Sequence, residues 1–174
     1  VCQVEKEMVE ILDVEQILSE VAPTRQDISE GIVNEGVQEN AKKHHILIVD
    51  DSSVARKQIK RCMEQVGFAT TVLCDGREAL DYLQGMVADG VDVTKEFAMV
   101  ISDIEMPEMD GYTLTTTIRN DSRLQDLFIL LHTSLSGVFN EAMVKKVGAD
   151  GFLAKFQPDE LARLAIETVQ AQSD

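Results

Sequence analysis

The chain has few aromatic residues and no long apolar run. It contains no Trp, and aromatic residues make up 5% of its 174 positions, whereas hydrophobic residues make up 44%. Its core must therefore be built mainly from aliphatic side chains. No stretch reaches the roughly 18 consecutive apolar residues that a membrane-spanning helix needs, and the first residues lack the apolar centre of a signal peptide. These absences predict a globular protein without direct membrane insertion.

Cysteine and basic residues are also scarce. The three cysteines are dispersed and form no Cys-x-x-Cys pair, which excludes a disulfide framework and disfavours a zinc or redox site. We expect reduced thiols and a cytoplasmic location. The chain has 16 Lys and Arg against 31 Asp and Glu, a net charge of −15. Because an acidic surface repels phosphate backbones, we predict that it binds no nucleic acid.

From Lys42 onward, short apolar runs alternate with longer amphipathic segments. The runs predict five strands, at His45–Asp50, Ala69–Leu73, Ala98–Asp103, Phe128–His132 and Gly151–Ala154. Most are apolar throughout, which is typical of parallel strands that are covered on both faces. The segments between and after them predict helices at Ser52–Val66, Arg77–Asp89, Tyr112–Asn120, Val138–Val147 and Pro158–Gln172. This alternation predicts an α/β fold, a doubly wound five-stranded parallel sheet.

Polar side chains stand at the carboxyl ends of the predicted strands, namely Asp50, Asp51, Asp103, Thr133 and Lys155. In an open parallel sheet these ends meet at the edge where ligands bind. Three carboxylates in one cleft need neutralisation, and Mg²⁺ is the cation that suits carboxylate oxygens, water and phosphate. An ammonium and a hydroxyl can hold phosphoryl oxygens. The set therefore predicts phosphoryl transfer to a carboxylate nucleophile.

Four motifs in chain order resemble response-regulator receiver domains of the CheY-like, flavodoxin-like type. They are Ile46–Ser52 (ILIVDDS), Ser102–Gly111 (SDIEMPEMDG), His132–Ser134 (HTS) and Phe152–Lys155 (FLAK). The resemblance implies that the protein is no enzyme beyond self-phosphorylation and slow autodephosphorylation.

The same resemblance implies a role for each site residue. Asp103 would accept a phosphoryl group from a histidine kinase. Asp50, Asp51, Asp103 and the backbone carbonyl of Glu105 would hold Mg²⁺, with Asp50 acting chiefly through a metal-bound water. Lys155 and Thr133 would contact the phosphoryl group, and Phe152 would turn inward behind Thr133 as a switch.

Two departures from the receiver pattern stand out. Phe156 follows Lys155, where the family usually has Pro. The stretch between Asp51 and Asp103 is longer than usual, and the excess falls near Gly85–Glu96 as a longer helix end or a loop. Because that region is remote from the acids, we expect no effect on their chemistry.

The first residues differ in character from the rest. Met8–Leu12 reads as a strand, and Asp13 could cap a short helix with Val14, Ile17, Leu18 and Val21 on one face. This segment resembles the last strand and closing helix of CheW-type coupling domains. We therefore predict a coupling-domain remnant at 1–22, a linker with room for a helical turn at 23–43 and a receiver at 44–174.

That arrangement resembles CheV-type chemotaxis coupling proteins, which implies a signalling adaptor with two kinds of partner. These are a CheA-type histidine kinase and, through the coupling domain, chemoreceptors. Phosphorylation would tune the coupling or drain phosphate. Two alternatives stay open. One is a haloacid-dehalogenase-type phosphohydrolase, which also uses Asp, Mg²⁺ and Lys. The other is a structural interaction module that is never phosphorylated.

Overall fold

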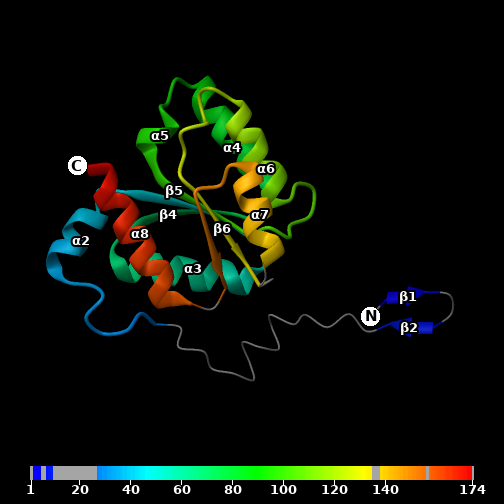
Figure 1. The fold of residues 1–174 in the computed structure, drawn as a ribbon, viewed down its shortest axis with the longest axis horizontal. Coiled ribbons are helices and arrows are strands. Elements are labelled where there is room, and N and C mark those ends of the chain that lie inside the picture. Colours follow the sequence, from blue (N-terminus) through cyan, green and yellow to red (C-terminus); the bar gives the residue numbers. More distant parts are fainter. Residues whose placement is uncertain (1, 5–6, 10–26, 135–137, 156, 174) are drawn as a thin grey trace.

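The computed structural model describes residues 2–4, 7–9, 27–134, 138–155 and 157–173. From residue 27 onward, these form a parallel sheet between two layers of helices (Figure 1). The strands of the sheet are β3 (His45–Val49), β4 (Ala69–Leu73), β5 (Phe97–Ser102), β6 (Ile129–Thr133) and β7 (Gly151–Ala154). They are all parallel and lie in the order β4-β3-β5-β6-β7. The predicted fold class is confirmed, and β4 and β7 have the predicted bounds.

One layer of helices comprises α4 (Gly76–Ala88), α5 (Val93–Glu96), α6 (Gly111–Asn120) and α7 (Val138–Val147). The other comprises α2 (Glu35–Ala41), α3 (Ser53–Val66) and α8 (Pro158–Ser173). Each layer packs on one face of the sheet, as the paths of α3 and α8 against those of α4 and α6 show in Figure 1.

Alternate residues of the central strands feed two separate cores. In β3, Leu47 and Val49 pack in the α4–α6–α7 core, whereas Ile46 and Ile48 pack in the α3–α8 core. All six residues of β5 are buried. Because successive strand residues point to opposite faces, a strand covered on both sides is apolar at most positions. This requirement explains the uninterrupted apolar runs of the sequence.

Short polar side chains start the helices that leave the carboxyl edge of the sheet. Ser52, Asp75 and Asp110 cap α3, α4 and α6, and each accepts a hydrogen bond from a backbone amide of its own helix. Such caps satisfy amides that have no partner within the helix. At the other end of α3, Gly67 ends the helix with a φ of 113°, a left-handed conformation that favours glycine.

The extra residues between the acids lie at the opposite edge of the sheet. Helix α4 ends at Ala88, and the short helix α5 then leads into the start of β5. Val93 of α5 is fully buried, so this insertion closes the amino-terminal end of the core. It is therefore remote from the carboxyl edge, as the sequence predicts.

The N-terminal strands β1 (Cys2–Val4) and β2 (Glu7–Val9) pair with each other as an antiparallel ribbon, separate from the main sheet. The predicted strand Met8–Leu12 overlaps β2 at Met8 and Val9. The predicted helix after Asp13 lies outside the described residues. Helix α2 falls within the predicted linker. Among the described residues, no helix is both long and apolar enough to cross a membrane.

Candidate acidic site at the carboxyl edge

Two buried aspartates share one buried lysine at the carboxyl edge of the sheet. The Nζ atom of Lys155 lies 3.0 Å from Oδ2 of Asp103 and 3.0 Å from Oδ2 of Asp50. The side chains of all three residues are at most 5% exposed. A charge is tolerated at such depth only when it is paired. The lysine thus holds together two acids that are far apart in the sequence.

The strand register brings these side chains together. Asp50 and Asp103 follow the last residues of the neighbouring strands β3 and β5, and the amide of Asp103 donates to the carbonyl of Val49 at 2.8 Å. Lys155 follows β7, and its amide donates to the carbonyl of Thr133 at 2.9 Å. The prediction that strand ends gather their polar residues at one edge is confirmed for this set.

Burial dominates the electrostatics of both acids. It raises the pKa of Asp50 from 3.8 to about 7, although the ammonium of Lys155 opposes the rise. Burial also raises the pKa of Asp103, against the ammonium of Lys155 and backbone hydrogen bonds that favour the charged form. The amide of Ile104 makes one of these bonds, to Oδ1 of Asp103 at 2.7 Å. More positive charge at this edge would therefore be needed to ionise both carboxylates fully.

A third carboxylate completes the cluster. Asp51 is exposed, and one carboxylate oxygen from each of Asp50, Asp51 and Asp103 can be chosen so that all three lie within 4.8 Å of one another. Oδ2 of Asp50 is buried and pairs with the ammonium of Lys155. Oxygen donors of this kind are those that Mg²⁺ prefers. The residues present therefore fit a hard divalent cation.

The remaining predicted residues lie around the cluster. Thr133 is the last residue of β6 and is fully buried. Phe152 is partly buried in β7 and packs against the α4–α6–α7 core. Glu105 is exposed, two residues after Asp103. Phe156, which stands at the usual proline position, lies outside the described residues.

The loop after Asp103 is shaped by close backbone contacts. The amide of Gly111 donates to the carbonyl of Ile104 at 2.9 Å, and a Cβ atom at Gly111 would collide with the backbone carbonyl of Asp103. Glu108 adopts a φ of 61°, in the left-handed region that few residues other than glycine occupy. The Asp-Gly end of the motif thus lets helix α6 start directly against the acidic site.

Sequence reasoning missed Arg56, on the first turns of α3. Its Nη1 atom donates to the carbonyls of Asp50 and Asp51, at 2.6 and 2.7 Å. The amide of Ser52 donates to Oδ1 of Asp50 at 2.9 Å, which further orients that carboxylate. The signal that could have indicated this role is an arginine about one turn into the helix that follows the acidic pair. Its target is a pair of backbone carbonyls, however, and sequence motifs do not record those.

His132 is buried beside the cluster. Only 4% of it is exposed, and its Nδ1 atom makes no hydrogen bond to any described residue. Burial, followed by the nearby charge of Lys155, lowers the pKa of His132 to about 3. The imidazole is therefore neutral at physiological pH. The ring is packed, but within the described part of the chain its Nδ1 atom lacks the hydrogen bond that a buried histidine usually makes.

Comparison with known proteins agrees with this geometry. Residues 46–166 match the family model for the response regulator receiver domain. The chain belongs to this family. Receiver domains are phospho-acceptors rather than catalytic enzymes, so the phosphohydrolase alternative is set aside.

The relatives include chemotaxis proteins of Helicobacter pylori. Chemotaxis protein CheV3 is 31% identical over 158 residues, which cover 86% of this chain and 47% of CheV3. Chemotaxis protein CheV2 is 28% identical over 165 residues, which cover 95% of this chain and 51% of CheV2. The chain therefore spans about half the length of these relatives. Among solved structures, Vibrio cholerae chemotaxis protein CheY4 superposes with a TM-score of 0.60 at 30% identity, covering 74% of this chain and 97% of CheY4.

Proposed function

We propose that the chain accepts a phosphoryl group on Asp103 from a histidine kinase, as the receiver of a chemotaxis signalling adaptor. The observation that carries this proposal is the shared lysine. Lys155 contacts Asp50 and Asp103 at 3.0 Å each, at the one edge of the sheet where the receiver motifs converge. An aspartate that only stabilised the fold would have no need of two further carboxylates beside it.

In the proposed reaction, a carboxylate oxygen of Asp103 forms a bond to phosphorus as the bond from phosphorus to the kinase histidine breaks. The ammonium of Lys155 moves with the developing charge, from the carboxylate to a phosphoryl oxygen. Thr133 offers its hydroxyl to another phosphoryl oxygen, and Phe152 then packs behind it. Such a reaction depends mainly on positioning and on charge neutralisation.

Mg²⁺ is part of the proposal. Asp50, Asp51, Asp103 and the backbone carbonyl of Glu105 would hold it, with Asp50 contributing chiefly through a bound water. The cation would supply positive charge next to the incoming phosphoryl group. Arg56 would support this site indirectly, because it fixes the backbone carbonyls of Asp50 and Asp51.

The adaptor role rests on the relatives and on the N-terminal residues. The alignments with the CheV proteins cover 86% and 95% of the chain, which is more than the receiver match at residues 46–166. We infer that residues 1–22 end a CheW-like coupling domain, that the kinase is of the CheA type and that chemoreceptors bind through the coupling domain. The protein would act in the cytoplasm, where phosphorylation would tune receptor–kinase coupling or drain phosphate.

The decisive experiment treats the chain with acetyl phosphate, with and without Mg²⁺, and measures the mass of the intact protein. We expect one phosphoryl group to be added in the presence of Mg²⁺, and none in Asp103→Asn. The matched control is Asp126→Asn, an exposed aspartate near the opposite edge of the sheet, which should be modified like the wild type. Equal modification of Asp103→Asn would place the acceptor elsewhere. An unmodified wild type would favour the interaction module that is never phosphorylated.

The kinase is tested by phosphotransfer. A phosphorylated CheA-type kinase should lose its label to the wild-type chain within seconds to minutes, whereas an unrelated histidine kinase should transfer more slowly. Equal rates from both kinases would remove the support for a chemotaxis partner while leaving the acceptor role intact.

A further inference from the structure

Residues 27–41 are fastened to the receiver by polar contacts with two helices. We call this segment the collar. Ser29 donates from its amide to Oδ1 of Asp159 at 2.7 Å and from its hydroxyl to Oδ2 at 2.6 Å. On α3, Gln65 accepts from the amide of Ile28 at 3.2 Å, and the carboxylate of Asp27 pairs with Arg61 at 2.6 Å. The collar is thus held at both α3 and α8.

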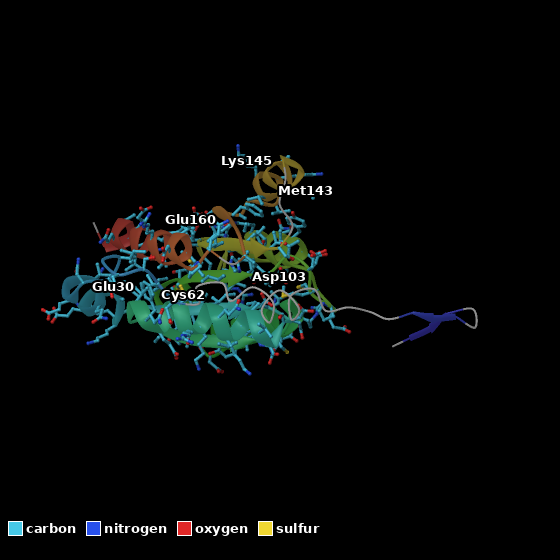
Figure 2. The ribbon with its side chains drawn as sticks, turned by 90° about the horizontal axis from the view of Figure 1, so that it is seen from below. Glu30, Cys62, Asp103, Met143, Lys145 and Glu160 are labelled. Atoms are coloured by element: carbon cyan, nitrogen blue, oxygen red, sulfur yellow. The ribbon has the colours of Figure 1, made fainter. Side chains whose placement is uncertain are left out.

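Apolar contacts accompany these hydrogen bonds. The side chains of Ile28, Ile32, Val33 and Val37 pack against the α3–α8 core, and Ala41 is 2% exposed. Helix α2, inside the collar, contacts both α3 and α8. Figure 2 labels Glu30 in the collar, Cys62 in α3 and Glu160 in α8, which lie on the same side of Asp103 in that view. The receiver family match begins at residue 46, after the collar. The collar is therefore a segment outside the matched receiver region that packs on α3 and α8.

The anchor at Asp159 lies close in sequence to the acidic site. Asp159 stands in the first turn of α8, four residues after Lys155. The start of α8 is also tied to α3, because Sγ of Cys62 donates to the carbonyl of Pro158 at 3.4 Å. Lys155 is held between two aspartates, and α8 begins three residues after it.

We propose that the collar is coupled to the acidic site through Lys155 and Asp159, so that modification of Asp103 changes how firmly Ser29 is held. The inference rests on the proposed function, because it requires a phosphoryl group on Asp103. That group converts one partner of Lys155 from a carboxylate into an acyl phosphate, and the ammonium must then follow the phosphoryl oxygens. The shift would be felt at the start of α8 and would alter the two hydrogen bonds between Asp159 and Ser29.

Coupling of this kind is reciprocal. If modification changes the strength of the Ser29 anchor by some factor, loss of the anchor must change the affinity of the site for a phosphoryl analogue by a factor of similar size. Couplings between sites are commonly about fivefold or more. The collar would thereby pass the phosphorylation state to whatever precedes it in the chain.

The test uses the full chain with beryllofluoride and Mg²⁺ as the phosphoryl analogue. Because the chain has no Trp, affinity is followed by fluorine NMR. Hydrogen exchange of the amides of Ile28 and Ser29 reports on docking. The variant is Ser29→Ala, chosen over a change at Asp159 because an acid in the first turn of α8 also stabilises that helix. The matched control is Ser122→Ala, an exposed serine near the opposite edge of the sheet.

We expect beryllofluoride to change the exchange rates of both amides about fivefold or more in the wild type and to leave them unchanged in Asp103→Asn. Ser29→Ala removes the hydroxyl hydrogen bond but keeps the amide one, so it should shift the beryllofluoride affinity by part of that factor, and Ser122→Ala should not shift it. Wild-type binding with unchanged exchange rates, and with equal affinities in the two serine variants, would overturn the coupling while leaving the proposed function in place. Absence of any binding to the wild type would overturn both.

Discussion

Folding raises the pKa of Asp50 and lowers the pKa of His132. Removing either side chain should therefore change how the free energy of unfolding depends on pH. Asp50 has a folded-state pKa of about 7 against 3.8 for the free side chain. Between these values the folded protein holds a proton that the unfolded chain releases. The contribution of Asp50 is therefore complete below about pH 4 and is lost as the pH rises toward 7. Each pKa unit is worth about 1.4 kcal/mol, so the loss is on the order of 4 kcal/mol.

His132 acts the other way. Its folded-state pKa of about 3 lies below the ordinary 6.5, so between these pH values the unfolded chain binds a proton at His132 that the folded protein does not bind. The contribution of His132 is complete above about pH 6.5 and is lost as the pH falls toward 3. Both groups are at most 4% exposed, so solvent screening reduces neither effect greatly. Near pH 5 to 6, the folded protein binds about one proton more than the unfolded chain at Asp50 and about one proton fewer at His132.

The variants are Asp50→Asn and His132→Leu, with Asp126→Asn as the control, and the assay is urea unfolding between about pH 4.5 and 7.5 in EDTA. Relative to wild type, the free energy of unfolding of Asp50→Asn should rise with pH by about 1.4 kcal/mol more per pH unit near pH 5 to 6. That of His132→Leu should fall by about the same amount. Profiles that stay parallel to wild type in both variants would refute the assigned burial energetics.

Three further predictions concern the metal, the loop and the far edge of the sheet. Mg²⁺ at a hundred times its dissociation constant should stabilise the chain by about 2.7 kcal/mol, as measured by urea unfolding, and Asp51→Asn should lose most of that gain. Gly111→Ala should destabilise the fold by about 1–3 kcal/mol and weaken beryllofluoride binding, because its Cβ meets the carbonyl of Asp103; an unchanged affinity would contradict the close approach. Arg119→Ala should cost about 2–3 kcal/mol in urea unfolding, because Arg119 donates to three backbone carbonyls and to the carboxylate of Asp150, yet it should leave beryllofluoride affinity at the wild-type value.

The order of the elements was predictable because its causes are local. A strand covered on both faces is apolar at most positions, and a capped helix after it shows an apolar stripe. Those constraints act on neighbouring residues, so β4 and β7 could be bounded from the sequence. The observed β3 ends one residue before the predicted strand, and β5 and β6 are displaced by one residue at both ends. The short helix α5 was missed, because four residues carry too little periodicity to distinguish a helix from a loop.

The chemistry of the site was predictable only in part. The rule that parallel strands end at one edge places Asp50, Asp103 and Lys155 together without any knowledge of distances. It does not show that both aspartates contact the same ammonium at 3.0 Å, or that Asp50 is deeply buried whereas Asp51 is exposed. Burial depends on which helices cover the edge, and it is burial that raises the pKa of Asp50.

By itself, the sequence determined the strand and helix pattern, the acidic residues and their likeness to a receiver. The tertiary structure alone decided that Ser29 hydrogen-bonds Asp159, 130 positions away, and that the Nδ1 atom of His132 is buried beside the acidic site. Periodicity and caps are written in residues within a few positions of each other. Contacts between distant residues depend instead on how whole helices pack, and no local pattern specifies that packing.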